Sequence, residues 1–279
     1  MIQRLIDFYK QIPPNSAEST MSDIWKGITS VRQIDLKNAL ISGDVSLVEK
    51  ILDGWVLSRG SEGVEYSPDV YSLPHPGLDR SKLTDNELAI PDPLGSVRAP
   101  TATGMVAQLI CRLNNGIPSH TLELGAGLGF MGVIMCRWGA KSYTDIDLPT
   151  MATAAAFYFS RCCGADRVRI GEEPASASTF ATYYPSTYCI GVLERKYDAI
   201  VNVNSFPEMP NSSQDSYLGI ISKSLKPGGF FLSINHENEV CGQRSLPHAV
   251  KAHDQLVLQK RNLSEVYPGG YMDEVYRLA

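Results

Sequence analysis

A glycine-rich segment followed by a carboxylate is the feature of this sequence that points most clearly to chemistry. Residues 121–129 read Thr-Leu-Glu-Leu-Gly-Ala-Gly-Leu-Gly, and Asp147 lies 22 positions after Gly125. Glycines let the backbone approach a ligand closely, and an acid about 20 residues further on can bind ribose hydroxyls. The string Gly127–Gly132 alone matches G-x-G-x-x-G, which is a weak signal because a tight turn without a ligand has the same composition. Since the acid also ends a predicted strand, we favour a ligand with an adenosine-like ribose.

Two further side chains that could move protons follow later predicted strands. His236 comes directly after Phe230–Asn235, and Glu208 comes shortly after Tyr197–Val203. Ligands gather at the carboxyl ends of parallel strands, and histidine titrates near physiological pH. We therefore predict His236 as a general base and Glu208 as the second candidate. The alternative roles are loop stabilisation for His236 and an interaction with a helix dipole for Glu208.

Oxygen ligands of the kind that Mg²⁺ prefers occur near the same strand ends. They are Glu208, Glu237, Asn238 and Glu239. No compact pattern of aspartates accompanies them, so Mg²⁺ is an alternative that the sequence does not favour, and we predict no required metal.

The elements that must position these residues alternate between strand and helix from residue 120 onward. Predicted strands are His120–Leu124, Ser142–Ile146, Arg167–Ile170, Tyr197–Val203 and Phe230–Asn235, and predicted helices are Phe130–Trp138, Pro149–Cys163 and Gln214–Leu225. The chain ends in two alternating segments, Gln255–Lys260 and Met272–Leu278, which should pair antiparallel. This pattern predicts an α/β fold with a doubly wound, Rossmann-like, mostly parallel sheet and an antiparallel C-terminal hairpin.

Residues 1–98 do not have the pattern of a sheet, so we predict a helical and irregular region that precedes a core at 99–279. The predicted helices before the first strand are Ile2–Gln11, Asp23–Ser30, Ser46–Leu52 and Thr101–Leu113, the third from the capping-box spacing of Ser46 and Glu49. Residues 57–98 are rich in Pro, Gly, Ser and Asp, which is typical of an irregular segment. We expect this region to cover the site as a lid.

Two groups of aromatic residues receive separate predictions. Phe157, Tyr158 and Phe159 lie on a predicted helix and are expected to pack in the core. Tyr183, Tyr184 and Tyr188 fall in the segment 171–196, which the sequence predicts to be a long loop.

Composition excludes several classes of protein. The net charge is −5 and no basic run occurs, so nucleic-acid binding has little support. No apolar run approaches the roughly 18 residues of a membrane span, and the first ten residues do not resemble a signal peptide. The six cysteines show no CxxC spacing. We therefore expect a cytoplasmic protein in a reducing compartment, with a homo-oligomer as an open alternative.

The segment around the glycines resembles the class I S-adenosylmethionine-dependent methyltransferases over roughly residues 99–279. The resemblance rests on Glu123 before the glycines, the acid after the second strand, the Lys-Pro-Gly-Gly segment at 226–229 and the closing hairpin. It implies S-adenosylmethionine as the cofactor. The cofactor-binding residues that it implies are Glu123, Gly125, Ala126, Gly127, Gly129, Asp147 and Leu148. Asp147 would accept hydrogen bonds from the ribose, Leu148 would pack on the adenine, and Glu123 would orient the turn or reach the methionine amino group through water.

Two shorter motifs narrow the resemblance. Asp-Leu-Pro at 147–149 and Asn-Val-Asn-Ser-Phe-Pro-Glu-Met at 202–209 resemble the bacterial sugar O-methyltransferase family. This resemblance implies a sugar or glycoconjugate hydroxyl as the methyl acceptor. It adds Asn204 and Ser205 to the cofactor-binding residues, and it implies acceptor-binding roles for Asn235, Glu237 and Tyr217.

Three alternatives remain open at this stage. A methyltransferase of a small natural product, with an O or N acceptor, would have the same donor site. An NAD-dependent oxidoreductase would use the same glycine turn. A binding subunit that has lost catalysis would keep the fold without the reaction.

Overall fold

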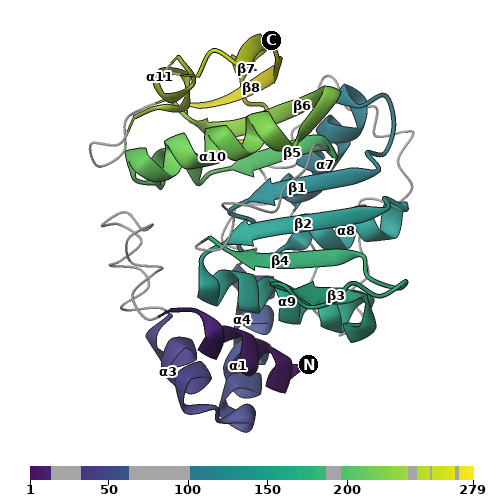
Figure 1. The fold of residues 1–279 in the computed structure, drawn as a ribbon, viewed down its shortest axis with the longest axis vertical. Coiled ribbons are helices and arrows are strands. Elements are labelled where there is room, and N and C mark those ends of the chain that lie inside the picture. Colours follow the sequence, from purple (N-terminus) through teal and green to yellow (C-terminus); the bar gives the residue numbers. More distant parts are fainter. Residues whose placement is uncertain (14–32, 63–100, 187–195, 238–243, 252, 268–269) are drawn as a thin grey trace.

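A single sheet of eight strands forms the centre of the computed structural model, which describes residues 1–13, 33–62, 101–186, 196–237, 244–251, 253–267 and 270–279 (Figure 1). The strands are β1 His120–Leu124, β2 Ser142–Asp147, β3 Val168–Ile170, β4 Ala181–Pro185, β5 Tyr197–Val203, β6 Leu225–His236, β7 Leu256–Leu263 and β8 Tyr271–Leu278. Their order is β3-β4-β2-β1-β5-β6-β8-β7. β8 pairs antiparallel with β6 and β7, and the other pairs are parallel. The predicted fold class is confirmed.

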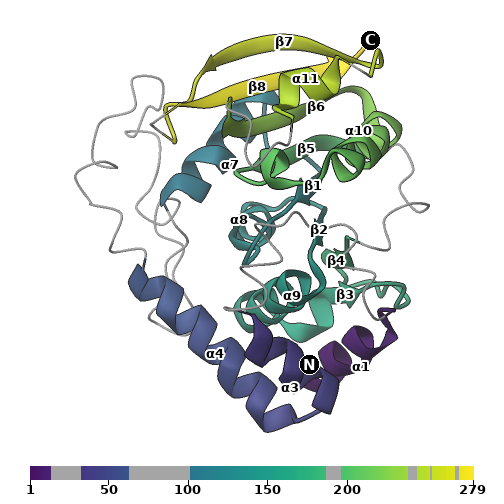
Figure 2. The ribbon, with the colours of Figure 1, turned by 90° about the vertical axis from the view of Figure 1, so that its left-hand side faces the viewer.

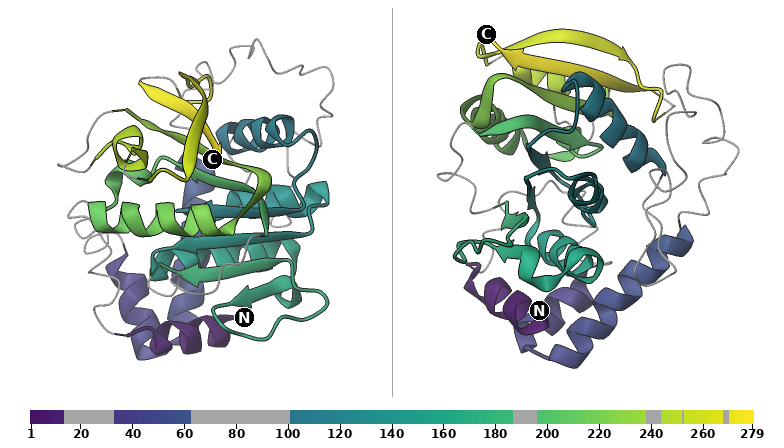
Figure 3. Two further views of the ribbon diagram at one scale, coloured as in Figure 1. Left: turned by 45° about the horizontal axis from the view of Figure 1, so that its top comes forward. Right: turned by 90° about the vertical axis from the view of Figure 1, so that its right-hand side faces the viewer.

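Helices cover both faces of this sheet (Figure 2). They are α1 Ile2–Gln11, α3 Ile34–Ser42, α4 Val45–Glu62, α7 Thr101–Leu113, α8 Phe130–Trp138, α9 Pro149–Cys163, α10 Asn211–Ser224 and α11 Leu246–Val250. α7, α8 and α9 share one apolar core with the sheet, whereas α10 and α11 share a second core on the opposite face (Figure 3). The sheet is therefore doubly wound, as the alternating pattern predicts.

Local sequence explains where the two helices nearest the glycine turn begin and end. Pro149 occupies the first position of α9, where its missing N–H costs no helical hydrogen bond. Gly139 ends α8 in the left-handed conformation, with φ +90°. The bounds predicted for both helices are confirmed.

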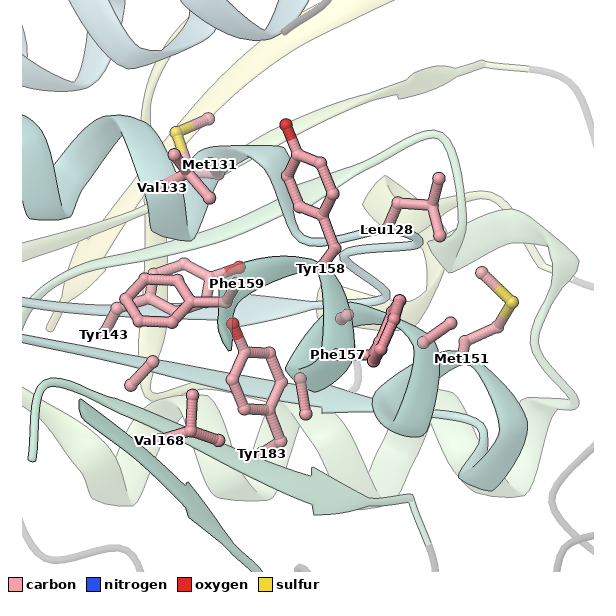
Figure 4. Packing of buried hydrophobic residues seen from close by; sticks show 14 of the residues in the cluster. Leu128, Met131, Val133, Tyr143, Met151, Phe157, Tyr158, Phe159, Val168 and Tyr183 are labelled. Atoms are coloured by element: carbon pink, nitrogen blue, oxygen red, sulfur yellow. The ribbon is translucent and has the colours of Figure 1, made fainter. Parts of the chain in front are cut away.

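The core between α8, α9 and the sheet is aromatic (Figure 4). Phe157–Phe159 on α9 are at most 2% exposed, which confirms their predicted packing role. Tyr143 on β2 and Tyr183 on β4 lie in the same core with their rings 6.4 Å apart.

The position of Tyr183 corrects the prediction of a long loop at 171–196. Residues 181–185 form β4, which pairs in parallel with β2 on one side and β3 on the other. Tyr183 and Tyr184 are therefore buried strand residues, and Tyr188 lies outside the described residues. A five-residue strand leaves little periodicity in the sequence, and what stabilises this one is pairing with residues far away in the chain.

Three other local predictions need correction. α4 begins at Val45 instead of Ser46, because the Asp44 carboxylate caps the helix by accepting the N–H of Leu47 at 3.0 Å. It continues to Glu62 instead of ending at Leu52, so residues 57–62 are helical and not irregular. α3 has no counterpart among the predicted helices. β6 begins at Leu225 instead of the predicted Phe230, so the segment 226–229 belongs to the strand. The predicted helix Asp23–Ser30 lies outside the described residues.

The described N-terminal helices pack at the β3 edge of the sheet and against α9 (Figure 1). Arg4 on α1 forms a half-exposed ion pair with Glu173 at 2.5 Å. Before α3, the buried Gln33 side chain accepts a hydrogen bond from Thr150 at the start of α9. The N-terminal region thus reaches the helix that follows Asp147. Its role as a lid stays a prediction, because residues 63–98 lie outside the described part of the chain.

Candidate functional site

The glycine turn between β1 and α8 adopts a backbone conformation that requires glycine. Gly125, Gly127 and Gly129 all lie in the left-handed region, with φ between +63° and +75°. At Gly125 the space is also closed, since an added Cβ would overlap with Ser205 Oγ and lie 3.0 Å from Ser205 Cβ. The turn therefore lies against Ser205, which follows the end of β5.

Asp147 at the end of β2 connects this turn to the start of α9. Its Oδ2 accepts the Gly127 N–H at 2.8 Å, and its Oδ1 accepts the Leu148 N–H at 2.6 Å. Burial raises the pKa of Asp147 to about 7, although these two backbone donors oppose the shift. A carboxylate oxygen has more than one lone pair, so both oxygens can still accept hydrogen bonds from a ligand. Leu148 lies beside them, partly buried against the core.

Two more acids lie beneath the turn. Glu123 on β1 is 6% exposed and accepts a hydrogen bond from Tyr143 Oη at 2.5 Å. Its neighbour in the parallel register is Asp145 on β2, which is fully buried. The backbone N–H of Ala126 faces the Asp145 carboxyl, yet neither carboxyl oxygen makes a hydrogen bond of ordinary geometry among the described residues. Burial, followed by the charges of Asp147 and Glu123, raises the pKa of Asp145 well above its usual range.

The sequence indicated Glu123 and Asp147 but not Asp145. The signal was present, because Asp145 and Asp147 are two residues apart on one strand and so share a face. Together with Glu123 they form what we call the acid cluster, three carboxyl groups that are buried next to the glycine turn.

The acid cluster makes the stability of the ligand-free protein depend on pH. Burial raises the pKa of Glu123 from its usual 4.5 to about 7. Between these values the folded protein holds a proton that the unfolded chain has released, so stability falls as the pH rises through this window. We expect Glu123→Gln to reduce that fall by roughly 3 kcal/mol, because glutamine stays neutral and can still accept the Tyr143 hydrogen bond. Urea unfolding at pH 4.5 and pH 8 measures the difference.

Glu172→Gln is the matched control, because this carboxylate is exposed. It should leave the pH dependence of unfolding as in the wild type. If Glu123→Gln also leaves the pH dependence of unfolding unchanged, the carboxyl of Glu123 does not hold a proton at neutral pH.

A network of amide groups joins the ends of β1, β5 and β6. Asn202 donates to the carbonyl oxygen of Leu124 at 2.8 Å and to Ser205 Oγ at 2.6 Å. Asn235 accepts the Ser205 N–H at 3.0 Å and donates to Asn202 Oδ1 at 2.8 Å. All of these side chains are buried. The structure thus places Ser205 and Asn235 together, in contacts that stabilise the turn after β5, and it adds Asn202, for which the sequence suggested no role.

A second group of side chains lies further out at the same edge. Asn204 is exposed and left-handed, with φ +53°. It accepts a hydrogen bond from Tyr271 Oη, and the Tyr271 ring lies 3.7 Å from the His236 ring, measured between centroids. Glu237 is exposed and pairs with Arg261 at 2.6 Å. The structure therefore brings the predicted residues Asn204, His236 and Glu237 close together.

The remaining predicted residues lie on the segment after β5. Glu208 ends a short 3₁₀ helix, Phe206–Glu208, and is partly buried. Tyr217 on α10 is 8% exposed and belongs to the apolar core on the α10 face. This burial leaves little of the Tyr217 side chain exposed for the predicted contact with an acceptor.

The described residues contain neither a cluster of metal-binding side chains nor a helix that could span a membrane. No group of three or more His, Cys, Asp or Glu side chains there could hold a metal ion, while Asn238 and Glu239 lie outside them. No described helix has the length and apolar character needed to cross a bilayer.

Solved structures to which this chain is similar share little of its sequence. No protein-family model and no curated protein matches the sequence. The solved structure of mitomycin 7-O-methyltransferase MmcR is 16% identical over 67% of this chain and 55% of its own, with a TM-score of 0.48. N-methyltransferase NodS from Bradyrhizobium japonicum WM9, solved with S-adenosyl-L-homocysteine, is 16% identical over 62% of this chain and 86% of its own, with a TM-score of 0.43. The match spans about half the length of MmcR. At these values the likeness identifies neither a cofactor nor an acceptor for this chain.

Proposed function

We propose that this chain transfers a methyl group from S-adenosylmethionine to a hydroxyl group of a sugar or glycoconjugate. The acid cluster next to the glycine turn is the observation that favours S-adenosylmethionine over NAD as the cofactor. S-adenosylmethionine has a cationic sulfonium and an ammonium group, whereas NAD has an anionic diphosphate. A nearby cation lowers the pKa of the buried carboxyls and favours their ionised form, whereas a diphosphate would repel them. A cationic cofactor therefore fits this turn better than a dinucleotide.

The remaining cofactor contacts are proposed from the resemblance described above. The backbone of Gly125, Ala126, Gly127 and Gly129 would lie against the methionine part and the ribose. Asp147 would accept hydrogen bonds from the ribose hydroxyls through its remaining lone pairs. Leu148, which is partly buried, would pack on the adenine. Asn204 and Ser205 would contact the cofactor from the end of β5.

The acceptor would lie at the ends of β5 and β6. In methyl transfer the acceptor oxygen bonds to the methyl carbon as the sulfur–carbon bond breaks, and the hydroxyl proton passes to a base. The protein contributes by orienting the acceptor and removing its proton. His236 is the proposed base, with Glu208 as the second candidate. Asn235, Glu237 and Tyr217 are proposed on the acceptor side by resemblance only.

Replacing His236 tests the proposed base. We expect His236→Ala to lower kcat by about 100-fold or more, since a positioned base typically contributes that much. The affinity for S-adenosylhomocysteine should stay within about twofold of the wild type, because His236 lies on the acceptor side of the turn. His248→Ala, which alters an exposed histidine on α11, is the control and should leave kcat unchanged. Unaltered turnover in His236→Ala would exclude this residue as the base.

Calorimetry with S-adenosylhomocysteine and with NADH tests the cofactor. Binding of S-adenosylhomocysteine supports the proposal, and tight binding of NADH alone would point to an oxidoreductase. A panel of nucleotide sugars, lipid-linked glycans and small natural products then identifies the acceptor class. Cofactor binding without turnover on any of them would favour a non-enzymatic binding subunit. Full activity after treatment with EDTA would argue against an exchangeable metal.

A further inference from the structure

The rings of His236, Tyr271 and Tyr267 meet at the carboxyl edge of the sheet. Tyr271 is the first residue of β8 and is the register partner of His236, the last residue of β6. The Tyr271 ring lies 3.7 Å from the His236 ring and 5.4 Å from the Tyr267 ring, measured between centroids. All three residues are partly exposed. We call this group the aromatic shelf.

The chain direction of the hairpin places the shelf at this edge. Because β8 runs antiparallel to β6, its first residue lies where the parallel strands end, which is also the edge of the glycine turn. Ser264, directly after β7, contacts both tyrosines: its Oγ accepts the Tyr267 N–H at 3.1 Å, and its N–H donates to the Tyr271 carbonyl oxygen at 2.8 Å. The buried Val266 side chain packs under it. The position of Tyr267 and Tyr271 is therefore defined by the local fold.

Direct contacts connect the shelf to the glycine turn. Tyr271 Oη donates a hydrogen bond to Asn204 Oδ1. Asn204 precedes Ser205, and Ser205 occupies the space where a Cβ on Gly125 would lie. Among the described residues, the Asn204–Ser205 turn therefore links the shelf to Gly125 of the glycine turn.

We propose that the aromatic shelf binds the methyl acceptor, and that the acceptor is a ring with a flat apolar face next to the reacting hydroxyl. The inference rests on the proposed function. Aromatic faces stack on flat apolar surfaces. The hydrogen bond from Tyr271 Oη to Asn204 Oδ1 and the ring nitrogens of His236 add polar groups beside the two tyrosine rings. The C–H face of a sugar and the face of a phenol both present this chemistry. Tyr271 is then an acceptor-binding residue that the sequence pattern did not reveal.

The shelf can be tested by nuclear magnetic resonance with two probes, methyl α-glucopyranoside and phenol, each with and without S-adenosylhomocysteine. We expect at least one probe to shift the His236 ring resonances in a saturable way. A response to the glucoside alone points to a sugar acceptor, and a response to phenol alone points to an aryl acceptor. Tyr271→Ala should weaken probe binding about tenfold, because it removes the stacking ring. Tyr271→Phe keeps the ring and should bind the probe within about threefold of the wild type.

Tyr276→Phe is the matched control, because it removes a hydroxyl from the same strand away from the shelf, where Tyr276 Oη donates to Glu274. It should bind the probe as the wild type does. The inference is overturned if neither probe shifts His236, or if Tyr271→Ala binds the probe as tightly as the wild type while unfolding at the same temperature. Failure of the proposed function would be a different result, namely no binding of S-adenosylhomocysteine in calorimetry, with the probe shifts retained.

Discussion

Replacing Asp147 with alanine is expected to lower the affinity for S-adenosylhomocysteine by roughly 100-fold or more. The substitution removes the proposed acceptor of the ribose hydroxyls. It also removes the acceptor of the Gly127 and Leu148 N–H groups, which connects the glycine turn to α9. Hydrogen bonds to an ionised group contribute about 1.5–3 kcal/mol each, so the loss of one ribose contact together with the turn geometry accounts for this magnitude. Isothermal titration calorimetry measures the affinity directly.

Two further variants distinguish the loss of the ribose contact from a general loss of structure. Asp147→Asn keeps one carbonyl oxygen but replaces the other acceptor with an NH₂ donor, so its affinity should fall between those of the wild type and Asp147→Ala. Asp166→Ala removes an exposed acid from the segment that precedes β3 and should bind as the wild type does. Equal affinities for Asp147→Ala and the wild type would show that Asp147 does not contact the cofactor.

Replacing Gly125 with alanine is expected to destabilise the protein by about 2–5 kcal/mol and to abolish measurable cofactor binding. One part of the cost is conformational, because Gly125 has φ +75°. The other part is steric, because the new Cβ would overlap with Ser205 Oγ. Urea unfolding and calorimetry with S-adenosylhomocysteine measure the two effects.

A double-mutant cycle with Ser205→Gly distinguishes these two parts. Removing the Ser205 side chain should recover the steric part, about 1–3 kcal/mol, and leave the conformational part. Gly219→Ala on α10 is the control, since no other atom lies within 4 Å of the new Cβ and the helix favours alanine by up to about 1 kcal/mol. Additive effects of Gly125→Ala and Ser205→Gly would show that the turn relaxes away from β5 without a steric cost.

Local signals in the chain predicted the donor half of the site. The glycines of 125–129, the acid at 147 and the proline at 149 each act on neighbouring backbone, so their effect is visible in a short segment of sequence. The alternation of apolar strands and helices predicted the sheet class for the same reason. The lid role of residues 1–98 and every assigned role of a site residue stay predictions.

The rest of the sheet and the proposed acceptor half of the site depend on contacts between distant segments. β4 takes its place beside β2 through pairing that the sequence of 181–185 does not display. Asn202 and Asn235 come from different strands, and they meet only because β5 and β6 are neighbours. Tyr271 reaches His236 only through the register of an antiparallel pair.

The sequence by itself thus determined the fold class and the glycine turn with its acid, because hydrophobic periodicity, glycine and proline act within a few residues. Only the tertiary structure decided the strand order, the burial of Asp145 beside Glu123 and the ring contact between Tyr271 and His236. These features depend on register and burial, which arise when segments far apart in the chain pack together. The proposed donor side of the site can therefore be predicted from local sequence, whereas the proposed acceptor side forms only when distant segments pack together.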